Sequence, residues 1–99
     1  MNIEELMEEI YRYAGEKGYH FTWKEAPKAL MLIVTEASEA MESWRDDDKE
    51  NYEIELADIV IRVLQMVAEL GFKDSFVKAI RKKMDKNWTR PYHHGRKVI

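Results

Sequence analysis

Two pairs of acidic residues in the middle of the chain have the types and spacing that a metal site needs. Glu36 and Glu39 are three residues apart, and so are Glu55 and Asp58. This spacing places both members of a pair on one face of a helix. If the two segments form an antiparallel hairpin that turns at Asp47, each acid lies opposite a member of the other pair. The four carboxylates then share one level of the hairpin, and they converge if both faces point inward.

Four carboxylates in a half-buried seam cannot all stay ionised without a cation. Ligands that are all oxygen favour a hard ion such as Mg²⁺, with Mn²⁺ as the other candidate. The chain has no Cys, and its three His residues lie outside the two pairs. The pattern therefore predicts a magnesium site that keeps positions open for water and phosphate oxygens, and it excludes a ferritin-like Glu-x-x-His site.

Spaced acidic pairs also arise without a metal in a chain this acidic. Glu5 and Glu8, for example, have the same spacing and no proposed role. In this alternative, Glu55, Asp58 and Arg62 form a solvated face with an ion pair four residues apart along the helix. The mirror placement of the two pairs and the apolar surroundings of the second pair favour the metal site.

The elements that must position these acids are helices. Apolar residues at helical spacing predict four of them, over about residues 2–16, 27–45, 48–70 and 75–88. Four Gly and two Pro are too few for an all-β fold rich in turns. We expect an all-α fold in which antiparallel helices form a bundle. A chain of 99 residues is too short for two cores, so residues 1–99 form one domain with an irregular basic tail over 89–99.

Capping signals set the expected helix boundaries. Asp47 and Glu50 have the spacing of a capping box, which places the start of the third helix near residue 48 or 49. Gly71 suits the position after its end, because glycine adopts the left-handed conformation without strain. The remaining signals are Thr22 with Glu25 ahead of the second helix, where Pro27 also suits a first turn, and Asp74 or Ser75 ahead of the fourth.

The third predicted helix is apolar around most of its circumference. Between Leu56 and Leu70 its polar residues form one narrow stripe, which consists of Asp58, Arg62, Gln65 and Glu69. A helix of this kind needs neighbours on most sides, and so short a chain has few to offer. We therefore expect a second chain to complete the bundle, in a homodimer or a homotetramer.

The net charge of −3 hides a separation of charge along the chain. Residues 1–72 carry 7 Lys or Arg and 17 Asp or Glu, whereas residues 73–99 carry 9 Lys or Arg and 2 Asp. This pattern indicates either a basic tail that binds nucleic acid, or acidic and basic groups that converge on one ligand. The absence of Cys, an acidic start and short apolar runs predict a soluble cytoplasmic protein with no membrane partner.

The acidic motif resembles the signature of a known enzyme family. Glu-Ala-Ser-Glu over residues 36–39, followed after fifteen residues by Glu-Leu-Ala-Asp over residues 55–58, is similar to the motif of MazG-like nucleotide pyrophosphohydrolases. These enzymes belong to the all-α NTP pyrophosphatase superfamily. The resemblance covers most of the chain, includes the apolar runs 30–34 and 59–61, and extends to the basic ending over residues 87–97.

The resemblance implies a Mg²⁺-dependent hydrolase that cleaves a nucleoside triphosphate between the α and β phosphates, giving the monophosphate and pyrophosphate. It assigns Glu36, Glu39, Glu55 and Asp58 as metal ligands in a bundle that assembles as a dimer or tetramer. Several relatives carry a second acid where this chain has Thr35. Glu36 or Glu39 then takes the proton of the attacking water, or the water needs little help.

The basic end and the aromatic residues supply candidates for substrate contact. Lys83, Asn87 and Arg90 follow one helix face at steps of four and three, and spacing and resemblance together favour them as groups that bind the triphosphate. Trp23 and Trp44 flank the acidic helix, and similar aromatics shape the base pocket of some relatives. Alternatively, the lysines form a solvated face and the tryptophans belong to a core or an interface.

Two other functions stay open at this point. One is a non-enzymatic helical module that binds nucleic acid through its basic C-terminal region, with strongly salt-dependent affinity. The acidic body repels a polyanion and no recognition motif is present, so we expect no nucleic-acid partner. The other is a structural interaction domain that gains no stability from Mg²⁺. His93 and His94 are expected to be tail residues, ordered by substrate or a partner chain.

Overall fold

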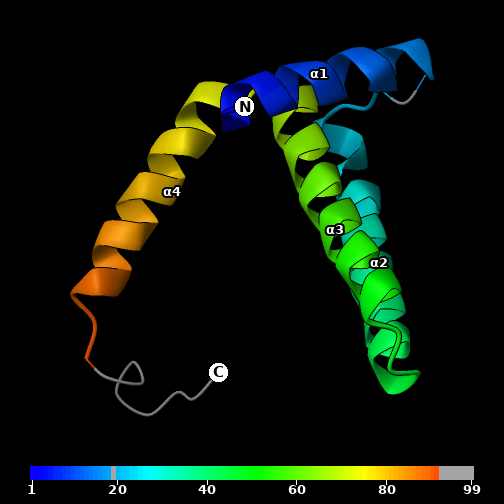
Figure 1. Ribbon diagram of the computed structural model, residues 1–99. Helices are drawn as coiled ribbons and strands as arrows, with labels where there is room; N and C mark the ends of the chain where they lie inside the picture. The colour runs from blue at the N-terminus through cyan, green and yellow to red at the C-terminus, as the bar shows by residue number, and fades with distance from the viewer. Residues whose placement is uncertain (19, 92–99) are drawn as a thin grey trace.

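The computed structural model describes residues 1–18 and 20–91, and these residues form helices joined by short turns, with no strand among them (Figure 1). Four α-helices are present: α1 (Ile3–Glu16), α2 (Ala26–Arg45), α3 (Lys49–Glu69) and α4 (Lys73–Trp88). A single 3₁₀ turn, η1 (Trp23–Glu25), leads into α2. The all-α fold with four helices is confirmed. None of the described helices combines the length and the apolar character that crossing a membrane requires.

The turn between α2 and α3 differs from the expected capping box in one detail. Asp48, not Asp47, caps α3, and its side chain accepts a hydrogen bond from the backbone N–H of Asn51 at 3.0 Å. Asp47 has a φ of 54°, in the left-handed region, and this conformation lets the chain reverse. The expected start of the helix is confirmed, whereas the expected cap is wrong because Asp47 forms the turn itself.

Of the other predicted boundaries, two match the expectation and one does not. Glu25 accepts hydrogen bonds from the backbone N–H and the hydroxyl of Thr22 at 3.0 and 3.3 Å, as expected for that capping pair. Gly71 follows α3 with a φ of 75°, as expected. Helix α4 begins at Lys73, ahead of both expected caps, and no side chain caps it; the Ser75 hydroxyl instead donates to the Phe72 carbonyl at 3.2 Å.

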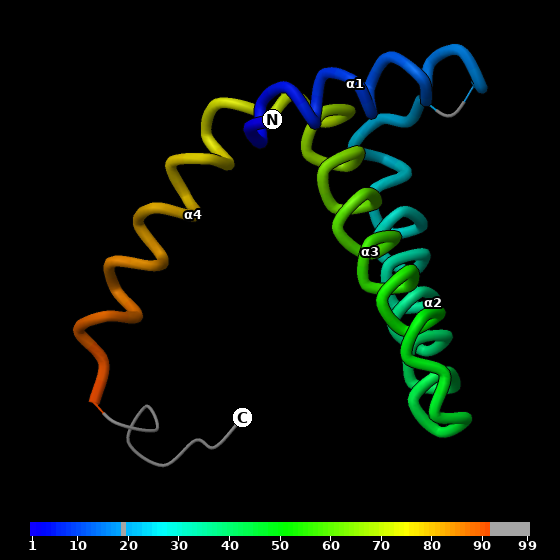
Figure 2. The backbone as a smooth tube through the Cα atoms, viewed as in Figure 1, coloured from blue at the N-terminus to red at the C-terminus, as the bar shows by residue number. Residues whose placement is uncertain are grey.

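Helices α2 and α3 form a long antiparallel hairpin, and α1 lies across its open end (Figure 2). The core is at this crossing. Met7 and Ile10 of α1 pack against Leu64 and Val67 of α3, and all four are less than 7% exposed. The core therefore occupies one end of the hairpin and leaves the rest of its length, including the acidic pairs, outside.

Helix α4 leaves this core and runs away from the hairpin (Figure 1). It has no buried residue, and only Phe76 and Val77 near its start pack against the core. The radius of gyration is 15.8 Å, whereas a compact domain of this length has one of about 13 Å. Among residues 1–18 and 20–91, most of α4 thus has no packing partner.

Candidate metal centre

The register of the α2–α3 hairpin is set by polar contacts beside its turn. The side-chain amide of Asn51 donates to the Ser43 hydroxyl oxygen at 2.7 Å, and that hydroxyl donates to the Glu39 carbonyl at 3.2 Å. Ser43 is only 6% exposed, so this contact is inside the seam. Ser43 and Asn51 lie four residues on either side of Asp47, which is the mirror relationship that relates Glu39 to Glu55.

This register brings three of the four predicted carboxylates together. Glu36, Glu39 and Glu55 each offer a ligand oxygen, and these oxygens lie within 4.8 Å of one another. Glu36 and Glu55 are each 7% exposed, whereas Glu39 is exposed to solvent. The group is therefore embedded in the seam on two sides and open on the third.

Asp58, the fourth predicted ligand, does not belong to this group of oxygens. It is half-buried on α3, one turn beyond Glu55, and its charge still acts on Glu55. The predicted set of four is thus a group of three with a fourth carboxylate beside it.

The crowding of these acids changes the proton affinity of one of them. A hydrogen bond from Glu55 to Glu39, burial in the seam, and the charges of Glu39, Glu36 and Asp58 raise the pKa of Glu55 from 4.5 to about 7. Each of these causes disfavours the negatively charged form of Glu55. A cation bound here would remove the same repulsion and would therefore compete with this proton.

One positive side chain contacts the acidic group from across the hairpin. Arg62 Nε lies 3.2 Å from Glu36 Oε1, and the two residues belong to α3 and α2. The alternative expectation, in which Arg62 pairs along its own helix, does not match this contact. The mirror spacing of the acids did not indicate this pair, because Arg62 lies seven residues beyond Glu55 and reaches back across the seam.

Arg62 also lines a cavity of about 470 Å³ next to the acidic group. Lys28 and Leu32 of α2 line it too, as do His20 and Phe21 from the segment before η1. The charged residues that line it are therefore two cations, Lys28 and Arg62, and one acid, Glu25. The cavity is large enough to hold part of a nucleotide-sized ligand.

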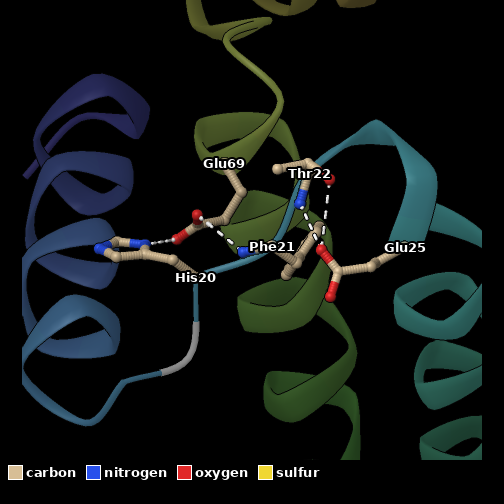
Figure 3. Close-up of polar contacts among 5 residues, drawn as sticks. All are labelled: His20, Phe21, Thr22, Glu25 and Glu69. Atoms are coloured by element: carbon tan, nitrogen blue, oxygen red, sulfur yellow. Dashed lines mark hydrogen bonds and ion pairs between the residues drawn. The ribbon is translucent and has the colours of Figure 1, made fainter.

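The wall of this cavity near η1 is held by a buried acid at the end of α3. The Glu69 carboxylate contacts His20 Nδ1 at 2.5 Å and accepts a hydrogen bond from the Phe21 backbone at 3.4 Å (Figure 3). The Glu69 side chain is only 3% exposed. This contact attaches the η1 segment to the hairpin, and the apolar periodicity of α3 alone did not reveal it.

The predicted tryptophans lie elsewhere. Trp23 is 72% exposed and contacts the Phe72 ring edge-on, with 6.4 Å between centroids. It lines a different, apolar cavity of about 700 Å³. Trp44 is 67% exposed and lines a third cavity with Met41 and Leu56. Within one chain, neither tryptophan lines the cavity that Arg62 borders, so their proposed role in base stacking has no geometric support there.

The predicted phosphate-binding residues are also separated from the acids in a single chain. Lys83 and Asn87 are exposed on α4, and Arg90 is half-buried just beyond its end. None of them lines the cavity next to the acidic group. Because α4 leaves the hairpin, one chain does not bring this part of α4 to its own carboxylates (Figure 1). His93 and His94 lie outside the described residues.

No family model, curated protein or solved structure matches the chain. The geometry of the acidic group and the motif over residues 36–39 and 55–58 are therefore the features that indicate a function.

Proposed function

We propose that this chain is a MazG-like nucleoside triphosphate pyrophosphohydrolase that works as a homo-oligomer. It hydrolyses an NTP or dNTP between the α and β phosphates and releases the monophosphate and pyrophosphate. The observation that carries the proposal is the group of ligand oxygens from Glu36, Glu39 and Glu55, which lie within 4.8 Å of one another. The motif resemblance supplies the reaction, because carboxylates alone indicate only that a hard cation fits.

A divalent cation fits this donor set. All the ligands are carboxylate oxygens, which Mg²⁺ and Mn²⁺ prefer. The raised pKa of Glu55 indicates that the negative charges of the group are not balanced by positive charge. Glu36, Glu39 and Glu55 would hold the ion, with Asp58 beside them. When bound, the ion supplies the charge that neutralises phosphate oxygens as the anhydride bond breaks.

Among the acids, Glu39 is the best placed to accept the proton of the attacking water. Its side chain is exposed to solvent, whereas Glu36 is buried and paired with Arg62. Thr35 does not substitute for a second acid, since a hydroxyl is a weak base and its Oγ donates to the Met31 carbonyl at 3.1 Å. We therefore assign proton transfer to Glu39 and positioning within the group to Glu36.

The cavity beside the acidic group supports a nucleotide as the substrate. Arg62 lines this cavity and pairs with Glu36 of the acidic group. Lys28 adds a second positively charged side chain to the lining. A triphosphate at the carboxylates can extend its nucleoside into this space. The two cations then lie close to the negative charge of the phosphate chain.

The test is pyrophosphate release from a panel of NTPs and dNTPs in the presence of Mg²⁺. We expect turnover of at least one substrate, and Glu39→Gln should lower its rate at least about 100-fold. Glu42→Gln is the matched control, because Glu42 is an exposed acid of the same helix outside the acidic group. No turnover of any substrate, or full activity in Glu39→Gln, would overturn the proposal.

A further inference from the structure

A short connector between α1 and η1 forms one wall of the cavity of about 470 Å³ beside the acidic group. We give this name to residues 20–22, of which His20 and Phe21 line the cavity. The last residue of the connector, Thr22, is held by its hydrogen bonds to Glu25. The connector has no regular secondary structure, so side-chain contacts must fix the position of its first two residues.

Glu69, at the end of α3, contacts the connector with both of its carboxylate oxygens (Figure 3). Oε2 contacts His20 Nδ1, and Oε1 accepts a hydrogen bond from the backbone N–H of Phe21. Because the Glu69 side chain is only 3% exposed, these contacts replace the water that its oxygens would otherwise bind. Glu69 is not among the described residues that line the cavity. Any effect of Glu69 on a ligand in the cavity is therefore exerted through the connector.

Gly15 of α1 leaves the room that the His20 ring occupies. A Cβ atom at Gly15 would lie 2.5 Å from His20 Nε2, well inside the normal contact distance. The backbone does not require glycine at this position, since Gly18 and Gly71 adopt the left-handed conformation and Gly15 does not. The Tyr11 ring of α1 also lies beside the His20 ring, with 4.8 Å between the two centroids. The His20 ring is therefore held between α1 and the end of α3.

The contacts with Glu69 and Gly15 involve the two different nitrogen atoms of the His20 ring. Glu69 holds Nδ1, and Gly15 faces Nε2. A movement that takes Nε2 away from a larger side chain at position 15 also moves Nδ1 relative to Glu69. Phe21 follows His20 directly in the chain, so a displaced His20 shifts the next residue of the cavity wall as well. A change on α1 can thus reach the cavity without touching a ligand there.

We infer that Glu69 is a positioning residue for the nucleotide. It holds His20 and the Phe21 backbone in the place that gives the cavity its shape, and Gly15 leaves the room that this placement needs. Glu69 is separated from Glu55 by about 20 Å along α3. Loss of Glu69 should therefore weaken nucleotide binding and leave the acidic group intact. That the ligand is a nucleotide rests on the proposed function, whereas the hold of Glu69 on the connector does not.

The division of the effect between KM and kcat tests this role of Glu69. Glu69→Ala should raise the KM of the hydrolysed nucleotide at least about 10-fold and change kcat less than about 3-fold. Glu69→Gln is the conservative control, because its amide oxygen accepts the Phe21 N–H and its amide nitrogen donates to His20 Nδ1. Its KM should stay within about 3-fold of the wild-type value. An unchanged KM in Glu69→Ala, or the same KM in both variants, would show that Glu69 does not act by positioning.

A double-mutant cycle between α1 and the connector provides the second test. Gly15→Ala adds one methyl group outside the described lining of the cavity and should raise KM at least about 5-fold, because it displaces the His20 ring. In a His20→Ala background no ring is displaced, so the same change should alter KM less than about 2-fold. Circular dichroism should show retained helix, since alanine favours a helix more than glycine does. An equal effect of Gly15→Ala in both backgrounds would reject the connection. If Glu69→Ala does not fold, this cycle decides.

Binding of α,β-methylene nucleotide analogues separates the role of Glu69 from the hydrolysis itself. In calorimetric titrations with Mg²⁺, the wild-type chain should bind at least one analogue, and Glu69→Ala and Gly15→Ala should each raise its Kd at least about 5-fold. Weakened binding in a chain that hydrolyses no nucleotide would reject the proposed function and keep the positioning role. Normal KM and Kd in both variants of an active chain would reject the positioning role and leave the proposed function standing. Failure of the wild-type chain to bind any analogue would overturn the positioning role as well.

Discussion

The side-chain amide of Asn51 lies 2.7 Å from the Ser43 hydroxyl oxygen and joins α3 to α2 one turn from the hairpin reversal. This contact sets the register that places Glu39 opposite Glu55. Register in a helical hairpin is otherwise weakly determined where the seam contains small residues such as Ala40. The acidic group therefore depends on a hydrogen bond between two uncharged residues that take no part in it.

Asn51→Ala should lower the free energy of unfolding by about 1–2 kcal/mol, because it leaves the buried Ser43 hydroxyl without this donor. The loss is measured by urea denaturation of the metal-free chain. The Ser43→Ala and Asn51→Ala double variant should lose less than the two single variants combined, since it removes both ends of the contact. Strictly additive losses would show that the two side chains do not interact.

Arg62→Gln should destabilise the metal-free chain by about 1–2 kcal/mol, because Glu36 is buried and loses the cation that faces it. Mg²⁺ should restore most of the lost melting temperature, since the ion replaces the missing charge. Arg45→Gln, an exposed position at the end of α2, is the control. Equal melting temperatures for Arg62→Gln and wild type without metal would contradict this role.

The pKa of Glu55 predicts how pH acts on the metal-free chain. It is about 7 in the fold and 4.5 ordinarily, so between these values the folded chain holds a proton that the unfolded chain has lost. The resulting stabilisation is fully present below pH 4.5 and disappears as pH rises through about 7. Mg²⁺ binding should release a proton near neutral pH and should strengthen as pH rises.

This dependence is measured as the melting temperature in EDTA from about pH 5 to about pH 8, where Glu55 contributes a fall. Glu55→Gln should remove that contribution, while Glu53→Gln should keep it, because Glu53 is an exposed acid of the same helix. Identical pH curves for wild type and Glu55→Gln would show that Glu55 titrates normally.

Helical spacing and mirror symmetry were enough to predict the helices and the position of the hairpin turn. Both signals are local, because periodicity follows from one helix and register from one turn. The placement of Glu36, Glu39 and Glu55 close together follows from the same two signals. The cap of α3 was harder, since Asp46, Asp47 and Asp48 are chemically equivalent and only backbone conformation distinguishes them.

Three features needed the structure because they depend on contacts between distant segments. Arg62 reaches across the seam to Glu36, and Asp58 stays outside the group of ligand oxygens. Side-chain rotamers decide both outcomes. The course of α4 is the third feature. The apolar residues Phe76, Ile80 and Met84 have the same spacing in the sequence whether the helix packs on its own chain or on another.

The most direct test of the acidic group as the metal centre is a crystal grown with Mn²⁺ and a non-hydrolysable NTP analogue. We predict an anomalous scattering peak among the carboxylates of Glu36, Glu39 and Glu55, with phosphate oxygens on its open side. The same crystal shows whether Asp58 joins as a further ligand. A structure with the analogue bound elsewhere and no peak at these three carboxylates would contradict the account.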